Sequence, residues 1–274
     1  PHPENIEVAW VLRDRAMKAD PEGNGGLATW DKTRPAMIEA EAVQRASMLS
    51  KAVGAPLYIV HTSSAIALET GLMQRQAGTE IYLETCPHYL THDISWTGGE
   101  VGKINPPLRH LADRERLWQA IGNGEIDTVA TDHVHRQISA KEGGIWKASP
   151  GCPGMETLLP IMLTEGYHAR GISLSRIVKL LSENPARIMG LGHCKGRISV
   201  GMDADLAIVN LDDVWTFNRD NVVSSAGYSI YEGWVMKARV RDTLVRGNII
   251  LRNGEPVAEA RGQGRFVPRY LNRA

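Results

Sequence analysis

The sequence predicts an α/β fold with parallel strands, followed by a small β-rich appendage. Short apolar runs alternate with segments of helical spacing over the first part of the chain, which is typical of parallel βα units. From residue 195 the pattern changes to alternating strands separated by turn sequences such as Gly-Met-Asp and Arg-Gly-Asn. A chain of 274 residues can form one large domain or one domain with an appendage. We therefore expect an α/β domain over residues 1–194 and a β portion over residues 195–274.

Three strands are expected in the first domain, at residues 55–64, 80–90 and 126–133. The first, APLYIVHTSS, is apolar and β-branched until it ends in His61 and three hydroxyl residues. A helical segment with a glycine stop follows it. A helix over residues 33–54, with Pro35 in its first turn and Gly54 at its end, leads into it. The first strand is thus flanked by helices, as a βα unit requires.

Further helices are expected in the second half of the chain. Residues 113–124 have helical spacing and a glycine cap before the third strand. Two more helical segments cover residues 155–169 and 173–191, the second with Ser173 or Ser175 as its N-cap. The strands expected in the β portion are DLAIVN (205–210), KARVRDTLVRG (237–247) and NIILRNGEP (248–256).

The composition is that of an ordinary globular protein, with 43% hydrophobic and 23% charged residues. The 31 basic residues balance the 31 acidic ones, so no strong net field favours nucleic acid or an anionic membrane as a partner. The three cysteines are odd in number and far apart, which argues against a disulfide framework and for a reducing compartment. No apolar run approaches the roughly 18 residues that a membrane span needs, and no leader segment is visible. The cytoplasm is therefore the expected location.

Two metal-type side chains, His61 and Asp132, stand where expected strands end. Parallel strands that finish in polar residues form a common rim, where α/β barrels and open α/β sheets place their chemistry. Histidine and carboxylate bind zinc-like ions, which lower the pKa of a bound water. Each residue alone has a simpler explanation: His61 as a hydrogen-bonded residue beside the Thr-Ser-Ser turn, and Asp132 as a helix cap. Their common position favours a metal site.

A series of motifs runs in order along the chain: LYIVHTSS, YLETCPHYL, KINPPLR, IDTVATDH, GCPGMETLLPIMLTEG, SENPARIMGL and KGRISVGMDADLAIVN. This series resembles the cyclic-amidohydrolase group of the amidohydrolase superfamily, which contains dihydropyrimidinases (hydantoinases), dihydroorotases and allantoinases. The resemblance implies a (β/α)8 TIM-type barrel with a small β-sandwich. It also implies a binuclear metal site that hydrolyses a cyclic amide, with two divalent metal ions that we expect to be zinc.

The resemblance also assigns the site residues. His2, in PHPEN, matches the group's H-x-E-N motif and His61 matches its H-x-S-S motif, so these two would hold one metal ion. Asp132, in T-D-H, would touch the other metal ion and act as general base and then acid. It would take the proton of a metal-bound hydroxide and deliver it to the departing ring nitrogen, which yields an N-carbamoyl amino acid or a similar ureido acid. His133 follows Asp132 and is expected to orient it.

The group's other ligands have no counterpart in these residues. They are a His-x-His pair on the first barrel strand and a carboxylated lysine that bridges the metal ions, and we expect both upstream of Pro1. A complete barrel takes about 250 residues, whereas residues 1–194 account for about strands five to eight. We therefore expect the second half of a barrel, either as a piece of a longer protein or as a half that needs a partner.

The resemblance places substrate contacts at Asn105, in INPPLR, and at Pro150 and Gly151, in SPGCPGME. Asparagine at position 105 is more typical of dihydroorotases, and hydantoinases tend to carry asparagine near position 150, so a standard hydantoin pocket is in question. Arg109 and Arg136 are candidates for pairing with a substrate carboxylate. We expect a small cyclic amide as substrate, a homo-oligomer (dimer or tetramer), and neither nucleic acid nor membrane as partner.

Two alternatives remain at the level of sequence. One is a specific dihydroorotase-type or allantoinase activity. The other is a non-catalytic scaffold homologue that has lost part of the metal site. Metal content distinguishes the scaffold from the hydrolase, because the hydrolase would bind about two divalent ions per chain and the scaffold none.

Overall fold

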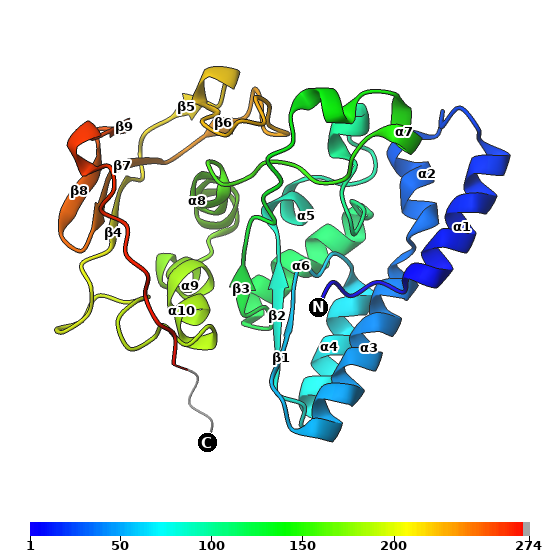
Figure 1. The fold of residues 1–274 in the computed structure, drawn as a ribbon, viewed down its shortest axis with the longest axis horizontal. Coiled ribbons are helices and arrows are strands. Elements are labelled where there is room, and N and C mark those ends of the chain that lie inside the picture. Colours follow the sequence, from blue (N-terminus) through cyan, green and yellow to red (C-terminus); the bar gives the residue numbers. More distant parts are fainter. Residues whose placement is uncertain (271–274) are drawn as a thin grey trace. The chain divides into compact units, whose positions relative to one another are not determined.

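The computed structural model describes residues 1–270 and divides the chain into two compact units. The first unit comprises Pro1–Leu158 and Asn218–Glu232, and the second comprises Leu159–Phe217 and the residues from Gly233 onward. Figure 1 shows the elements of both. The division reflects compactness alone, so the domain boundary expected at residue 195 stays a prediction.

The first unit contains a parallel three-stranded sheet in the order β1-β2-β3 (Figure 1). Its strands are β1 (Leu57–Ile59), β2 (Ile81–Thr85) and β3 (Thr128–Val129). Leu57 lies opposite Ile81, and Thr85 lies opposite Val129. The expected parallel βα arrangement is confirmed, with strands shorter than the sequence predicted.

The helix α3 (Ala36–Val53) leads into β1, α4 (Ala65–Gln76) joins β1 to β2, and α6 (Leu111–Asn123) lies between β2 and β3. Pro35 was predicted to lie in the first turn of α3, but it is the N-cap residue of this helix, because its backbone is extended (ψ 152°) rather than helical. Thr33, the expected start of this helix, instead ends the separate helix α2 (Gly26–Thr33). Ser64 caps α4 by accepting a hydrogen bond of 3.3 Å from the backbone N–H of Ala67.

Gly124 ends α6 in the left-handed region, with φ 82°, and a Cβ there would meet no atom within 4 Å. Gly124→Ala is therefore expected to destabilise the fold by about 1 kcal/mol through backbone strain alone. Gly264→Ala is the matched control, because Gly264 also faces open space but has no positive φ. Urea unfolding of both variants measures the difference, and equal midpoints would contradict the prediction.

The strand predicted over residues 80–90 is wrong in its second half. The strand β2 ends at Thr85, and the short helix α5 (Pro87–Thr91) follows. Pro87 stands in the first turn of α5, where its fixed φ suits a helix and its missing N–H has no intrahelical partner to lose. The other elements of this unit are the long helix α1 (Ile6–Ala19) and the short elements η1 (Gly99–Gly102), η2 (Ile138–Lys141), α7 (Gly144–Lys147) and η5 (Arg219–Asn221).

The core of the first unit contains aliphatic side chains from both the sheet and its helices. Ile59, Leu68, Leu83, Leu117 and Ile121 are each 0% exposed. Burying one such side chain stabilises a fold by about 1.5–3 kcal/mol. This packing fixes the strands whose ends carry the candidate site.

The second unit combines helices with antiparallel sheets. Its four-stranded sheet has the order β4-β7-β8-β9, with β4 (Leu206–Asn210), β7 (Arg239–Val245), β8 (Asn248–Arg252) and β9 (Glu255–Pro256). A second sheet pairs β5 (Trp215–Thr216) with β6 (Val235–Met236), and η6 (Ala258–Ala260) lies near the end of the described chain. The strands predicted over residues 205–210 and 237–247 are confirmed, whereas the one predicted over residues 248–256 is wrong, because a turn at Asn253 and Gly254 divides it into the antiparallel strands β8 and β9.

The helices of this second part of the chain are α8 (Leu158–Ile161), η3 (Met162–His168), α9 (Leu174–Val178), η4 (Lys179–Glu183) and α10 (Asn184–Ile188). The helix predicted from residue 155 begins only at Leu158, and η3 and η4 have π-helical hydrogen bonding. Ser173, one of two predicted caps, accepts a 3.2 Å hydrogen bond from the N–H of Arg176. Among the described residues, no helix has the length and apolar character to span a membrane.

Candidate metal centre

The ends of β1 and β3 carry the two residues that the sequence singled out. His61 follows β1 with φ 42°, and Asp132 follows β3 with φ 44°. Positive φ is uncommon for residues other than glycine and costs conformational free energy. Such strain persists only where the surroundings hold it, and it is concentrated at functional sites.

His2 and His61 are in direct contact. The Nδ1 atom of His2 lies 2.8 Å from the Nε2 atom of His61, and the two rings meet edge to face. His61 is 5% exposed, and its Nδ1 is buried without a hydrogen-bond partner in the structure. Burial, followed by the charge of His2, lowers the pKa of His61 to about 4. His61 is therefore neutral near pH 7, which is the form that binds a metal ion.

Glu4 orients the ring of His2. The Nε2 atom of His2 lies 2.6 Å from Oε2 of Glu4, and Glu4 also forms an ion pair with Arg34. The Glu4 side chain is 1% exposed, whereas that of His2 is 47% exposed. A carboxylate bonded to the second ring nitrogen is the usual partner of a metal-binding histidine, because it fixes the tautomer and the ring orientation.

Glu84, on β2, holds the backbone of His61. Its Oε1 atom accepts a 3.1 Å hydrogen bond from the N–H of His61, and its Oε2 atom accepts one of 2.5 Å from the hydroxyl of Tyr58. Burial raises the pKa of Glu84, and the negative charge of Asp132 raises it further. The sequence did not single out Glu84, because it lies in the middle of the strand predicted over residues 80–90, whereas the observed strand β2 ends one residue after it, at Thr85.

Asp132 lies close enough to His2 for their charges to interact, and its side chain keeps solvent access. Partial burial raises the pKa of Asp132, and the positive charge of His2 opposes this shift. Over residues 1–270, no group of three or more His, Cys, Asp or Glu side chains is arranged to hold a metal ion. The structure thus joins His2 to His61 and places Asp132 nearby, and the full ligand set stays a prediction.

The histidine pair fits a zinc-like ion. Two nitrogens bound to one tetrahedral zinc ion lie about 3.3 Å apart, and the present separation is 2.8 Å. The two nitrogens that face each other are thus near the separation that a shared ion needs. The buried, unpartnered Nδ1 atom of His61 would gain no partner from this ion, because Nε2 is the atom that faces His2.

The ring of His133 bonds to a neighbouring loop. Its Nδ1 atom accepts hydrogen bonds of 3.1 and 3.3 Å from the N–H groups of Gly154 and Met155, and its Nε2 atom lies 3.4 Å from the hydroxyl of Ser224. These contacts fix the loop that follows Pro150 and Gly151. The expected role of His133 in orienting Asp132 stays a prediction.

The segments that carry the predicted substrate contacts are joined. Gly151 donates a 2.9 Å hydrogen bond to the carbonyl of Lys103, two residues before Asn105. The Oδ1 atom of Asn105 accepts a 3.2 Å hydrogen bond from the indole N–H of Trp30, and the Lys103 ammonium lies 4.1 Å from the centre of the same ring. Pro150 is half-buried beside Gly151. This arrangement brings Asn105, Pro150 and Gly151 to one region of the first unit.

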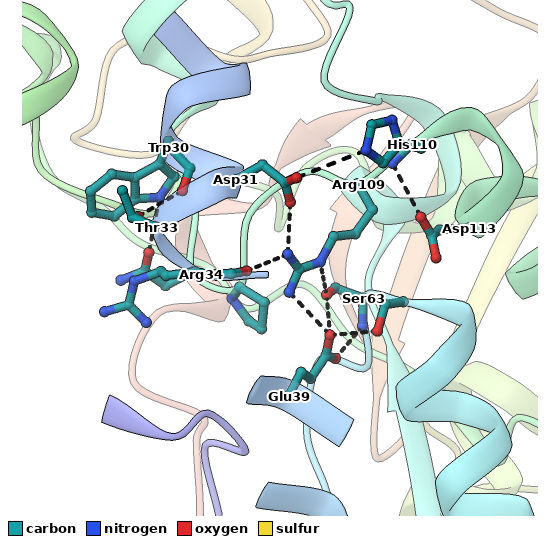
Figure 2. Close-up of polar contacts among 12 residues, drawn as sticks. Trp30, Asp31, Thr33, Arg34, Glu39, Ser63, Arg109, His110 and Asp113 are labelled. Atoms are coloured by element: carbon teal, nitrogen blue, oxygen red, sulfur yellow. Dashed lines mark hydrogen bonds and ion pairs between the residues drawn. The ribbon is translucent and has the colours of Figure 1, made fainter. Parts of the chain in front are cut away.

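Arg109, a candidate for pairing with a substrate carboxylate, is already paired within the protein. Its side chain is 3% exposed, and its guanidinium pairs with Asp31 at 2.7 Å and with Glu39 at 3.3 Å (Figure 2). The prediction that Arg109 could meet a substrate carboxylate is wrong, because these acids already occupy its donors. Arg136 is exposed.

Comparison with known proteins identifies relatives along nearly the whole chain. The amidohydrolase family model matches residues 108–250. An L-hydantoinase of Paenarthrobacter aurescens is 34% identical over 98% of this chain and 59% of its own length. An allantoinase of Deinococcus radiodurans is 36% identical over 96% of this chain and 58% of its own.

Comparison with solved structures also finds a relative along nearly the whole chain. The crystal structure of dihydropyrimidinase from Brevibacillus agri NCHU1002 matches with a TM-score of 0.90 and 32% identity, over 98% of this chain and 59% of that one. The chain therefore spans about three fifths of the length of the relatives it matches.

Proposed function

Because the chain belongs to the amidohydrolase family, we propose that it carries part of the active site of a metal-dependent hydrolase that opens a small cyclic amide. The observation that carries the proposal is the His2–His61 contact at 2.8 Å, with His61 and Asp132 each following the carboxyl end of a parallel strand, β1 and β3. We further propose that the sheet β1-β2-β3 is part of the second half of a (β/α)8 barrel. Its similarity to a dihydropyrimidinase over 98% of the chain supports this.

The metal ion would be held by Nδ1 of His2 and Nε2 of His61, the two nitrogens that face each other. Imidazole nitrogens favour zinc among the common divalent ions. When bound, metal ions would polarise the scissile carbonyl and lower the pKa of water at the site. A second ion, near Asp132, and a bridging carboxylated lysine remain predictions.

Asp132 would carry out the proton transfers of the reaction. In the hydrolysis of a cyclic amide, a C–O bond forms, the ring C–N bond breaks, and the nitrogen gains a proton. Asp132 would take a proton from the attacking water and deliver it to that nitrogen, which avoids expelling an amide anion. A carboxylate with a raised pKa suits both steps, because it accepts a proton more readily than a free carboxylate. Glu4 would keep His2 in position throughout.

The substrate is proposed as a hydantoin or dihydropyrimidine ring, with allantoin as a second candidate. Similarity to an L-hydantoinase favours the first, and similarity to an allantoinase favours the second. Asn105, held by Trp30, would contact the ring, together with backbone groups at Pro150 and Gly151. A homo-oligomeric state and a cytoplasmic location also remain predictions.

A substrate panel tests the proposed reaction. The natural protein, loaded with zinc, is mixed with dihydrouracil, hydantoin, allantoin and dihydroorotate, and ring opening is followed by loss of ultraviolet absorbance. We expect one of these amides to be opened and the product to be a ureido acid. If all four stay intact while zinc is bound, the hydrolase proposal fails and the scaffold alternative gains support.

Metal binding by the histidine pair gives a separate prediction. His61→Ala is expected to weaken zinc binding by more than about 100-fold, because even residues that only orient a metal ligand contribute 10–100-fold. Zinc affinity is measured by competition with a chromogenic chelator. His135→Ala is the control, because His135 is an exposed histidine two residues after His133. If His61→Ala keeps wild-type zinc affinity, His61 is not a ligand.

A further inference from the structure

The turn that carries His61 is anchored by a buried carboxylate, Glu39 of α3. The Oε1 atom of Glu39 accepts a 2.7 Å hydrogen bond from the N–H of Ser63. Its Oε2 atom accepts hydrogen bonds from the hydroxyls of Ser63 and Ser64, at 2.6 and 2.8 Å. Figure 2 shows this carboxylate below Ser63 and Arg109. Glu39 is 0% exposed, so each of these donors replaces a water molecule that the buried charge has lost.

Arg109 completes the anchor from the opposite side. Its Nη2 atom pairs with Glu39 at 3.3 Å, and its Nε atom donates a 3.0 Å hydrogen bond to the same Ser63 hydroxyl that Glu39 accepts from. Its Nη1 atom donates to Asp31 and to the carbonyl of Arg34 (Figure 2). One guanidinium thus fixes Ser63 and Glu39 together, and its planar, five-donor geometry makes this placement specific.

The same network reaches the other histidine of the pair. Arg34, whose carbonyl accepts from Arg109, forms an ion pair with Glu4, and Glu4 holds Nε2 of His2. His61 lies two residues before Ser63 and has a strained φ of 42°. The contacts of Arg109 therefore lead to both histidines. They reach His2 through Arg34 and Glu4, and they reach the turn that carries His61 through Ser63.

We propose that Glu39, held by Arg109, is a positioning residue that fixes the turn at residues 61–64 so that Nε2 of His61 faces Nδ1 of His2. This inference rests on the proposed metal site. A strained backbone relaxes when the groups that hold it are removed. Loss of the Glu39 contacts would let the turn relax, and the two ring nitrogens would no longer converge on one ion.

The test measures zinc affinity in the natural protein, by chelator competition, for Ser63→Ala and Glu39→Gln. Ser63→Ala removes the hydroxyl shared by Glu39 and Arg109, and Glu39→Gln removes the charge but keeps the shape. We expect both variants to bind zinc about 10-fold or more weakly than wild type, as is typical of residues that orient metal ligands. Ser47→Ala is the matched control, because Ser47 is a buried serine of α3 whose hydroxyl donates only to the carbonyl of Val43, at 2.7 Å.

The outcomes separate this inference from the proposed function. If Ser63→Ala keeps wild-type zinc affinity while His61→Ala loses it, the positioning role is overturned and the metal site stands. If His61→Ala itself keeps full affinity, the metal site fails. A general loss of stability would weaken zinc binding equally in Ser63→Ala and Ser47→Ala, and that result also overturns the inference. Should Glu39→Gln not fold, Ser63→Ala decides.

Discussion

Replacing Asp132 with asparagine is expected to lower kcat for the cyclic amide by about 1000-fold. Proton transfer by a positioned side chain contributes about 100- to 10,000-fold to rate, and asparagine has nearly the same shape but cannot take a proton from water. The raised pKa of Asp132 makes it a better base than an ordinary aspartate. The change is made in the natural protein, with zinc present, and kcat and KM are measured separately. We expect KM to change little, because the substrate contacts that we propose are at other residues, Asn105, Pro150 and Gly151.

Asp14→Asn is the control for this change. Asp14 lies on α1, and its side chain is 65% exposed. It should leave kcat unchanged, whereas Asp132→Asn should not. Zinc content is measured in both variants, since a loss of metal in Asp132→Asn would show that the lower kcat reflects a lost ligand and not only a lost base. A kcat within a few-fold of wild type would remove Asp132 from the mechanism.

The rim residues could be predicted from sequence because their signal is local. His61 and Asp132 each end an apolar strand, and the periodicity of a single segment shows where a strand ends. Helix ends with glycine, such as Gly124 after α6, were predicted for the same reason. The strand prediction failed where two local signals disagreed. The residues after Thr85 were read as a continuation of the strand, but Pro87 favours the first turn of a helix and begins α5.

The groups that hold the site could not be predicted, because each acts on a residue far away in the chain. Glu39 bonds to a serine 24 residues later, and Glu84 bonds to the backbone of a histidine 23 residues earlier. Arg109 and Glu39 are 70 residues apart. No spacing rule connects such positions. The position of Arg109 in a loop motif therefore suggested an exposed ligand for substrate, whereas its side chain is buried and pairs with two acids, Asp31 and Glu39.

Acid should destabilise the first unit through two buried histidines outside the proposed metal pair, His88 and His92. Burial lowers the pKa of His88 to about 3 and that of His92 to about 4. Below pH 6.5 the unfolded chain binds protons at these residues and the folded one does not, so stability is lost as pH falls from 6.5 toward the folded pKa values. At pH 5 each histidine accounts for about 2 kcal/mol of lost stability relative to pH 7.5.

The prediction is tested by urea unfolding of His88→Gln and His92→Gln at pH 7.5 and pH 5. Each variant should lose about 2 kcal/mol less than wild type between the two pH values. Comparing variants is necessary because burial raises the pKa values of Glu39 and Glu84, which stabilises the folded state as pH falls and so masks part of the histidine effect. That carboxylate contribution is common to all the proteins and cancels in the difference. His135→Gln, at an exposed position, should follow wild type. If all four proteins lose the same stability, His88 and His92 are not the groups that acid must charge.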